Sequence, residues 1–456
     1  MDSDIKVKEI RLKFQKEPFR FPLKFGTVVM EEMVYCYSQV VVENRKGKVA
    51  TGWGSMPLGI LWAFPSSSVS YEKKEEAMKE VSLRFARLVE SYPLFSHPVD
   101  IFWEVEEDLK RIAKEVSREM KLEEELPFLA SLVSASPIDA SLHDAFGKVN
   151  QISSYQGYGK EFMNHDLSLY LGKRYRGKYI GDYLRKEYLK ELPVFHLVGG
   201  LDRLRRKEVN SYPEDGLPYS LEEWVEKDGL DSLKIKLTGK DLSWDISRIL
   251  EVSRIAREVR KKKGWKDSLF LSLDTNEQCE SPEYMIELLK KIREKEARVF
   301  EEILYIEQPT GRDLEKYSFN MKNLSSLKPV LMDESLTGVK EMDKAVELGW
   351  SGIALKTCKC HSSCLLLVCR AEEERMIYTV QDLTLYGISL VHSVGFSARI
   401  NTLRGVESNG IQYHSPDSFL KEKKIHPGIM FRKEGKVNTY SIRGYGLGFQ
   451  IEKILE

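Results

Sequence analysis

The chain has 456 residues, enough for two domains or for one large barrel with an attached domain. Its 70 Lys and Arg residues balance its 70 Asp and Glu residues, so no overall field favours nucleic acid or an anionic membrane surface. The six cysteines are too few for a disulfide scaffold, and no apolar run is long enough to span a membrane. The amino terminus also lacks a signal-peptide pattern. We therefore expect a cytoplasmic enzyme.

The first part of the chain predicts an α+β domain. Residues 5–14 alternate apolar and polar side chains, and residues 33–47 are a β-rich run that ends in a turn signal. Residues 52–68 are rich in Gly, Pro and Ser and predict an ordered loop, and residues 71–121 have helical periodicity. Residues 134–149 open with an N-cap signal and predict a helix. No catalytic cluster is evident in this part.

From about residue 190, short apolar runs alternate with amphipathic stretches, which is typical of parallel βα units. Both an open doubly wound sheet and a closed barrel fit this alternation. No GxGxxG or GxxxxGK[ST] motif follows a strand, which favours the barrel. The expected strands lie in 193–200, 233–237, 269–274, 302–309, 330–335, 352–357 and 376–382.

Charged residues recur once per βα unit, where the expected strands end. Because the active site of a parallel barrel lies at the carboxyl ends of its strands, we expect these side chains to converge. In chain order they are Lys234, Lys236, Asp274, Glu307, Asp333, Lys356 and Asp382.

Three carboxylates from consecutive strands form an oxygen-ligand set that suits Mg²⁺, and the absence of His or Cys from the set disfavours zinc. The lysine strands lie on either side of the carboxylate strands, so Lys236 and Lys356 are expected to face each other across the metal. Such a pair can remove and return a proton α to a substrate carboxylate while the metal stabilises the enediolate. Lys234 shares a face with Lys236 and supplies a neighbouring cation that lowers a lysine pKa.

These residues resemble a known family. KIK at 234–236, DTNE at 274–277, IEQP at 306–309, MDES at 332–335 and ALKT at 354–357 are together similar to the mandelate racemase/muconate lactonizing enzyme group of the enolase superfamily. Outside the barrel, SPIDASLHDAFGK at 136–148 resembles the helix that precedes the barrel in that group, and 25–33 and 52–59 resemble its capping loops.

The resemblance implies a modified TIM barrel, (β/α)7β, over about 190–409, with an α+β capping domain formed by 1–165 and completed by about 410–456. It implies Mg²⁺ on Asp274, Glu307 and Asp333, with Lys236 and Lys356 as the acid/base pair. A lysine on each side is similar to the muconate-lactonizing subgroup. Glu334 adjoins Asp333, and the motif favours Asp333 as the ligand.

The reaction expected from the resemblance is racemisation or epimerisation, or cycloisomerisation, of a small carboxylate by a homo-oligomer. Acid-sugar dehydration by the same residues is one alternative, and a non-catalytic barrel that binds a metal or ligand is another. Dipeptide epimerases carry an Asp-x-Asp near the end of the barrel, and residues 410–416, taken as the comparable stretch, lack it.

Several residues have two interpretations. Asn276 and Gln308 could support the metal ligands or belong to plain loops. Asp382 could offer an extra polar contact, and His196 could reach the substrate from the first barrel strand or be a core residue. The cluster Cys358, Cys360, His361 and Cys364 could form a metal site, but its spacing fits neither a zinc ribbon nor haem attachment, so a tight turn is the preferred interpretation.

Overall fold

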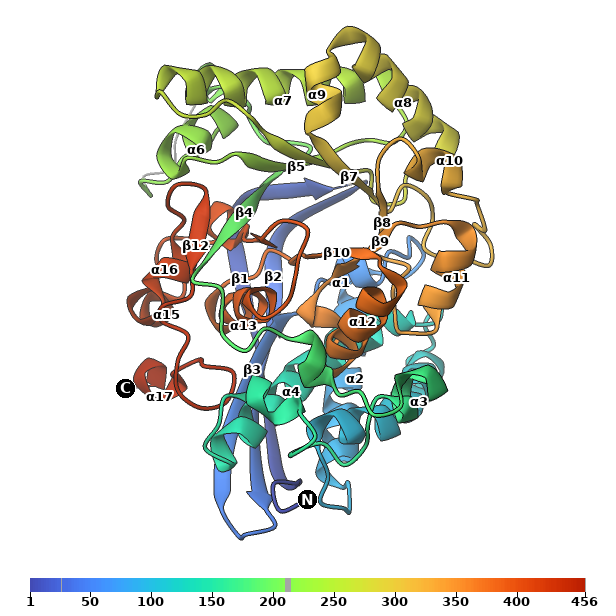
Figure 1. Ribbon diagram of the computed structural model, residues 1–456, viewed down its shortest axis with the longest axis vertical. Coiled ribbons are helices and arrows are strands. Elements are labelled where there is room, and N and C mark those ends of the chain that lie inside the picture. Colours follow the sequence, from blue (N-terminus) through green and yellow to red (C-terminus); the bar gives the residue numbers. More distant parts are fainter. Residues whose placement is uncertain (26, 210–214, 456) are drawn as a thin grey trace.

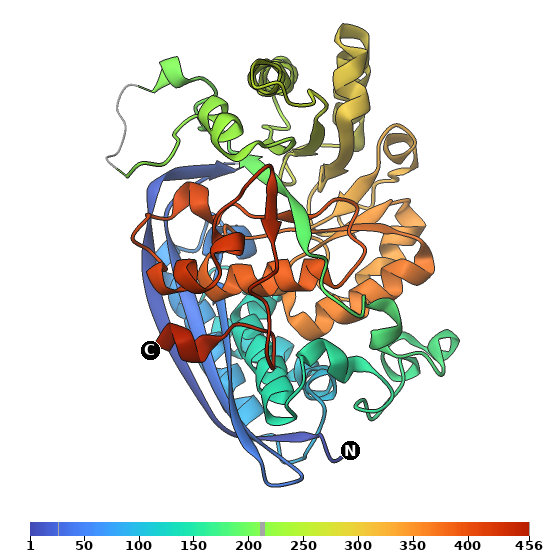
Figure 2. The same cartoon turned by 60° about the vertical axis from the view of Figure 1, so that its left-hand side comes forward.

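The computed structural model describes residues 1–25, 27–209 and 215–455. Its amino-terminal part is a three-stranded antiparallel sheet, β1 Ile5–Phe25, β2 Val28–Asn44 and β3 Val49–Pro57, in the order β1-β2-β3. Helices lie beside the sheet (Figure 1), which runs along one side of the molecule (Figure 2). These helices are α1 Ile60–Ala63, α2 Tyr71–Glu90, α3 Pro98–Glu119 and α4 Phe128–Val149.

Helix α4 begins six residues before the sequence pattern indicates. The expected N-cap, Ser134, lies inside the helix, where its hydroxyl donates to the carbonyl of Ala130 at 2.8 Å. The apparent start signal failed because buried Ser hydroxyls can bond the preceding helical turn as well as cap a helix. Almost every residue of α4 is buried, so this helix forms the centre of the amino-terminal core.

Two glycines allow β3 to lie directly on α4. A β-carbon on Gly52 would come within 2.1 Å of the carbonyl oxygen of Ser141, and one on Gly54 within 2.1 Å of that of Pro137. The GWG pattern, which predicted a loop, therefore lies in strand β3, where the strand backbone packs directly against the backbone of α4.

Eight parallel strands close into a barrel, because the first strand pairs with the last as well as with the second. Each of the first seven is followed by at least one helix before the next barrel strand begins, which confirms the predicted (β/α)7β barrel with a capping domain. The strands are β4 Glu191–Val198, β5 Ser232–Lys236, β6 Phe270–Asp274, β7 Ile303–Glu307, β8 Val330–Met332, β9 Gly352–Leu355, β10 Ile377–Val380 and β11 Val406–Glu407.

The outer helices cover the barrel, and the capping sheet lies below α7 and α8 in the view of Figure 1 and along the left-hand side in that of Figure 2. They are α6 Leu221–Asp228, α7 Leu242–Lys262, α8 Pro282–Lys295, α9 Ala297–Glu302, α10 Lys322–Ser325, α11 Glu341–Leu348, α12 His361–Glu374 and α13 Gly387–Ala398. Among the described residues, no helix is both long and apolar enough to cross a membrane.

The end of the chain contacts both parts. Strand β12 Lys436–Asn438 pairs antiparallel with β4, while the short helix α17 Ile451–Leu455 lies beside the capping sheet (Figure 2). The connecting segment holds α14 Gly410–Tyr413, α15 Leu420–Ile425 and α16 Pro427–Met430. Short helices also precede the barrel, among them α5 Ser168–Leu171.

Candidate active site

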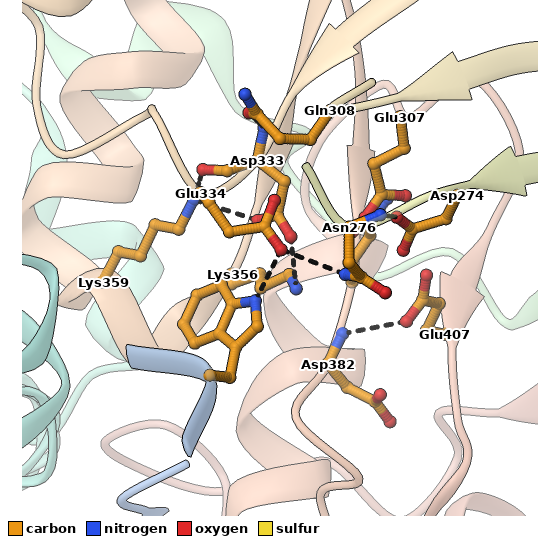
Figure 3. A network of polar contacts seen from close by, with 12 residues as sticks. Asp274, Asn276, Glu307, Gln308, Asp333, Glu334, Lys356, Lys359, Asp382 and Glu407 are labelled. Carbon is orange, nitrogen blue, oxygen red and sulfur yellow. Dashed lines mark hydrogen bonds and ion pairs between the residues drawn. The ribbon is translucent and has the colours of Figure 1, made fainter. Parts of the chain in front are cut away.

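The carboxyl ends of the barrel strands bring the charged residues together, as the spacing in the sequence indicated (Figure 3). Lys236 at the end of β5 lies in register with Asp274 at the end of β6, and Asp274 with Glu307 at the end of β7. Asp333 follows β8 directly and Lys356 follows β9. All five side chains are buried.

The two lysines of β5 bind the carboxylates of the neighbouring strands. Lys236 Nζ donates to Asp274 Oδ2 at 2.5 Å and to Asn276 Oδ1 at 2.8 Å. Lys234 Nζ lies deeper and donates to Glu307 Oε1 at 2.7 Å, with Asp274 Oδ2 at 3.3 Å. Both side chains point into the barrel because residues two apart on a strand share a face.

On the opposite side of the site, two lysines hold one carboxylate. Lys356 Nζ lies 2.7 Å from Asp333 Oδ2, and Lys359 Nζ lies 3.1 Å from Asp333 Oδ1 and 2.5 Å from the Asp333 carbonyl oxygen. The ring of Trp62 covers Lys356, whose ammonium is 4.5 Å from the ring centroid. Trp62 belongs to α1, so the capping domain contributes directly to this site.

Strand alternation supports Asp333, rather than Glu334, as the residue that faces the barrel interior. Leu331, two residues before Asp333, packs inside the barrel with Phe195 and Tyr305. Glu334 turns toward the capping domain, where its Oε1 accepts hydrogen bonds from Trp62 Nε1 at 2.9 Å and from Asn276 Nδ2 at 3.0 Å.

Asn276 and Gln308 both contact the proposed metal ligands or their loops. Asn276 donates its backbone N–H to Asp274 Oδ1 at 2.8 Å. Gln308 Oε1 accepts the backbone N–H of Asp333 at 2.8 Å and the hydroxyl of Ser335 at 2.8 Å, which orients the segment after β8. Both residues have positive φ, at 44° and 31°, a region that non-glycine residues seldom adopt.

After β10, the residue that reaches the carboxylates is Gln381. Its Nε2 donates to Glu307 Oε2 at 2.6 Å, and its Oε1 lies 3.2 Å from Lys234 Nζ. Asp382, the residue singled out from the sequence, instead lines the pocket and accepts hydrogen bonds from the backbone N–H groups of Thr384 and Asn409. Strand β10, Ile377–Val380, ends two residues earlier than the charge pattern suggests.

His196 does not reach the pocket. The next residue on β4, Leu197, lines the pocket, so alternation turns His196 to the outside of the barrel. There its Nδ1 lies 3.0 Å from Arg432 Nη1, and its ring packs beside Trp224. His196 is thus a buried residue on the outer face of β4.

The cysteine-rich segment forms the turn after Lys356, with a 3-10 turn at Thr357–Lys359 and α12 beginning at His361. Its cysteines are free and buried. Cys360 adopts φ 71°, and Cys364 Sγ donates to the backbone carbonyl of Lys356 at 3.1 Å. Among the described residues no cluster of three or more His, Cys, Asp or Glu is arranged to hold a metal in this structure; this applies to the cysteine segment and also to Asp274, Glu307 and Asp333 as they lie here.

The last barrel strand ends before residues 410–416, the stretch in which the sequence was searched for an Asp-x-Asp. β11 consists of Val406 and Glu407, and residues 410–413 form a helix, so 410–416 is not the stretch that follows the barrel directly. Glu407 itself lies in the site, with its Oε1 2.9 Å from Lys234 Nζ. A two-residue strand has too little periodicity to be recognised in the sequence.

The site holds more negative than positive charge. Four lysines, 234, 236, 356 and 359, face six buried carboxylates, those of Asp274, Glu307, Asp333, Glu334, Asp382 and Glu407. If all ionise, two negative charges remain uncompensated, the deficit that one divalent cation fills. Three carboxylate oxygens of the site are buried without a hydrogen-bond partner among the described residues: Asp333 Oδ2, Glu334 Oε2 and Glu407 Oε1. Asp333 Oδ2 and Glu407 Oε1 each lie beside a lysine ammonium, whereas Glu334 Oε2 has no such ion pair.

The pKa values of the carboxylates reflect this excess. Burial, and next the charge of Asp274, raise the pKa of Glu307 well above its usual range. Burial and the charge of Asp333 raise the pKa of Glu334 to about 7. Burial also opposes ionisation of Asp274, but Lys236 and Lys234 outweigh it and lower its pKa to about 2. One divalent charge beside these groups would favour their ionised forms.

The donor set fits Mg²⁺ in its chemistry, although in this structure ammonium groups lie against the carboxylates. All candidate ligands are carboxylate oxygens, which hard divalent cations prefer. Lys359, Glu407 and Trp62 were not identified from the sequence. Lys359 follows Lys356 by three residues, and Trp62 lies in the Gly/Pro-rich segment 52–68. Neither position in the sequence distinguishes a site residue from a surface residue.

Comparisons with known proteins agree with this architecture. No curated protein matches the chain. Among solved structures it resembles the substrate-liganded L-Ala-D/L-Glu epimerase from Bacillus subtilis, at 16% identity over 97% of this chain and 98% of that chain, with a TM-score of 0.63. It also resembles the Pseudomonas fluorescens muconate lactonizing enzyme complexed with muconolactone, at 16% identity, 99% and 98% coverage and a TM-score of 0.61.

A third similar structure is the N-succinyl Arg/Lys racemase from Bacillus cereus, at 16% identity over 99% of this chain and 97% of that chain, with a TM-score of 0.60. At these identities the likeness shows the fold. The sequence model of the family described as "Enolase C-terminal domain-like" matches residues 218–454, more than half of the chain. This chain therefore belongs to the enolase C-terminal domain-like family.

Proposed function

We propose that this protein removes a proton α to the carboxylate of a small substrate in a Mg²⁺-dependent reaction, as a racemase, epimerase or cycloisomerase. The observation that carries the proposal is the placement of Lys236 and Lys356 in one pocket, on strands that flank the three strands ending in Asp274, Glu307 and Asp333. Two potential proton carriers thus flank one set of oxygen ligands.

Asp274, Glu307 and Asp333 would hold the metal. When bound, Mg²⁺ would neutralise negative charge that develops on the substrate carboxylate as the α-proton leaves. The uncompensated negative charge of the site and the oxygen-only donor set support this assignment. Gln308 and Asn276 would hold the ligands in place through their hydrogen bonds to Asp333 and Asp274.

The lysines would carry the proton. One lysine in its neutral form takes the α-proton, and the other, in its ammonium form, gives a proton to the opposite face of the same carbon, which inverts the configuration. Burial lowers the pKa of Lys356, but the charge of Asp333 outweighs burial and the net pKa is raised, which favours the proton-donating form. Cycloisomerisation would use the same groups with a nucleophile inside the substrate.

Lys234 would act as a fixed positive charge. Its ammonium group lies among Glu307, Asp274 and Glu407, and these charges outweigh burial and raise its pKa well above its usual value. Lys234 is thus held among three carboxylates, and we assign the acid/base roles to Lys236 and Lys356, which lie on either side of the three carboxylate strands.

The test is hydrogen exchange in D₂O. With Mg²⁺ and a library of chiral carboxylic acids, NMR should show deuterium at the α-carbon and inversion of configuration. Lys236→Met and Lys356→Met should each abolish inversion, and each should retain exchange with only one enantiomer, because one proton carrier remains. Lys421→Met, an exposed lysine on α15, is the control.

Other outcomes would identify other functions. Release of a 2-keto acid without inversion would show elimination, as in an acid-sugar dehydratase. Unchanged activity in both Lys236→Met and Lys356→Met would overturn the proposal. Mg²⁺ binding without exchange of any acid would favour a non-catalytic barrel.

A further inference from the structure

The pocket above the lysines has two unlike parts. Its inner end carries the ammonium groups of Lys234, Lys236 and Lys356, and its empty volume, including the part open to solvent, is about 500 Å³. Its outer wall comes from the capping domain and is built from the side chains of Leu23, Phe25, Met30, Met33 and Trp62.

The capping wall offers a ligand almost nothing to hydrogen-bond. Among the described residues that line it, none is charged and none has a hydroxyl or amide side chain. The one strong polar group is the indole N–H of Trp62, and it already donates to Glu334 Oε1 at 2.9 Å. The wall therefore presents apolar surface to whatever lies beyond the reacting carbon.

The polar side chains on the barrel side of the pocket are also engaged with each other. Asn409 Oδ1 accepts the backbone N–H of Leu197 at 2.9 Å, and its Nδ2 donates to Asp382 Oδ1 at 3.2 Å. The same Asp382 oxygen accepts the backbone N–H of Thr384 at 3.1 Å, and its Oδ2 accepts that of Asn409 at 3.0 Å. Thr384 carries the one hydroxyl among the described lining residues.

Glu407 is engaged as well, because its Oε1 is 2.9 Å from Lys234 Nζ and its Oε2 accepts the backbone N–H of Asp382 at 3.4 Å. Leu197 and Leu383 complete the barrel side with apolar surface. A substrate rich in hydroxyl groups would bury several hydroxyls in this pocket, where the Thr384 hydroxyl is the one side-chain partner left for them among the described lining residues. Buried hydroxyls without hydrogen-bond partners weaken binding.

Resting on the proposed function, we infer that the substrate is a carboxylic acid with an apolar group beyond its α-carbon, and that polyhydroxy acids are excluded. The carboxylate lies at the lysine end and the apolar group lies against the capping wall. An acid-sugar enzyme on the same scaffold could have the same catalytic residues. The apolar side chains of the capping wall distinguish this protein from such an enzyme.

The test compares, in each of two pairs, an apolar acid with a hydroxylated acid that carries the same reacting groups. The pair 2-hydroxy-4-methylpentanoate and gluconate shares a carboxylate, an α-hydroxyl and six carbons, and N-acetyl-leucine paired with N-acetyl-serine varies the side chain alone. In D₂O with Mg²⁺, kcat/KM for α-exchange should be about 100-fold higher or more for the apolar member of each pair. The same acids are also tested for a Mg²⁺-dependent rise in Tm, which reports binding without turnover.

The outcomes separate the two proposals. Exchange that is equal within a pair or faster with gluconate would overturn the apolar substrate and leave the proposed function standing. A Tm rise with the apolar acids alone, without exchange, would support the apolar pocket and overturn the proposed function. If neither exchange nor a Tm rise occurs with any of these acids, the apolar substrate is overturned.

A variant tests whether the capping wall causes the preference for apolar acids. Met30→Gln places an amide in the wall, and the preference for the apolar member should fall by about tenfold. Met120→Gln, at the end of α3 and outside the pocket, is the matched control, and melting curves verify that both variants fold. If wild type shows the preference and Met30→Gln retains all of it, the wall does not select the substrate.

Discussion

Lys359 binds the same carboxylate as Lys356, from the other side. It is almost completely buried, and it reaches both the side chain and the backbone carbonyl of Asp333. Breaking a buried ion pair by removing one partner leaves an uncompensated charge, which is more costly than the pair was worth. Asp333 would then depend on Lys356, and on a metal when one is bound, for compensation.

We therefore expect Lys359→Met to lower the free energy of unfolding by about 3–5 kcal/mol without Mg²⁺, and by less with saturating Mg²⁺. Urea titrations with and without the metal measure both values. Lys424→Met, an exposed lysine on α15, should change neither. An equal loss in both conditions would show that the metal does not compensate Asp333.

At the scale of elements, the capping domain holds the turn that carries Lys356 and Lys359. Helix α4 provides Asp139, whose Oδ2 accepts the backbone N–H of Ser362 at 2.9 Å and whose Oδ1 accepts the Ser362 hydroxyl at 2.7 Å. His143 Nε2, one helical turn along, lies 2.7 Å from the same hydroxyl. Because Ser362 lies in the first turn of α12, the turn before this helix is tied to α4 by buried hydrogen bonds.

Ser362→Ala should lower the free energy of unfolding by about 1–3 kcal/mol, because it leaves buried acceptor and donor atoms of Asp139 and His143 without a partner. Chemical denaturation measures the loss. Ser247→Ala, on the exposed side of α7, should be nearly neutral. A neutral Ser362→Ala would mean that the link between α4 and α12 adds no stability.

Over the whole molecule, buried histidines make stability depend on pH. Burial, and next the charge of His143, lower the pKa of His392 to about 3. An unfolded chain takes up this proton below about pH 6.5, whereas the folded chain does not. The contribution of His392 is therefore complete above pH 6.5 and is lost as the pH falls toward 3. Its neighbours include His361 at 3.0 Å, His143 and Asp139.

In His392→Gln, the slope of unfolding free energy against pH should decrease by about 1.4 kcal/mol per pH unit between pH 6 and 4. Denaturation at several pH values measures the slope. His165→Gln, at an exposed position, should leave it unchanged. An unaltered slope in His392→Gln would show that His392 is protonated in the folded protein.

Metal binding should also appear as a property of the whole molecule. Mg²⁺ at about 100 times its Kd adds about 2.7 kcal/mol to the stability of the folded state, which for a chain of this length is a rise in Tm of about 3 °C. Glu307→Gln should abolish the rise, and Glu287→Gln, on the exposed face of α8, should not. A rise that survives in Glu307→Gln would place the cation elsewhere.

The sequence by itself determined the barrel and the order of its charged residues. Each βα unit is local in the chain, so its apolar strand and the polar residue at its end are visible as one repeated pattern. That pattern was sufficient to place Lys236, Asp274 and Glu307 at neighbouring strand ends, which the strand register shows, and Lys356 directly after β9.

Only the tertiary structure decided which side chains face the interior and what covers them. Whether Gln381 or Asp382 reaches Glu307, and whether His196 points inward, depends on strand register, and a shift by one residue reverses every side chain. The apolar capping wall and the contact of Trp62 with Lys356 join residues some 300 positions apart in the chain. Local periodicity contains no information about such contacts, because they arise when two separately formed parts pack together.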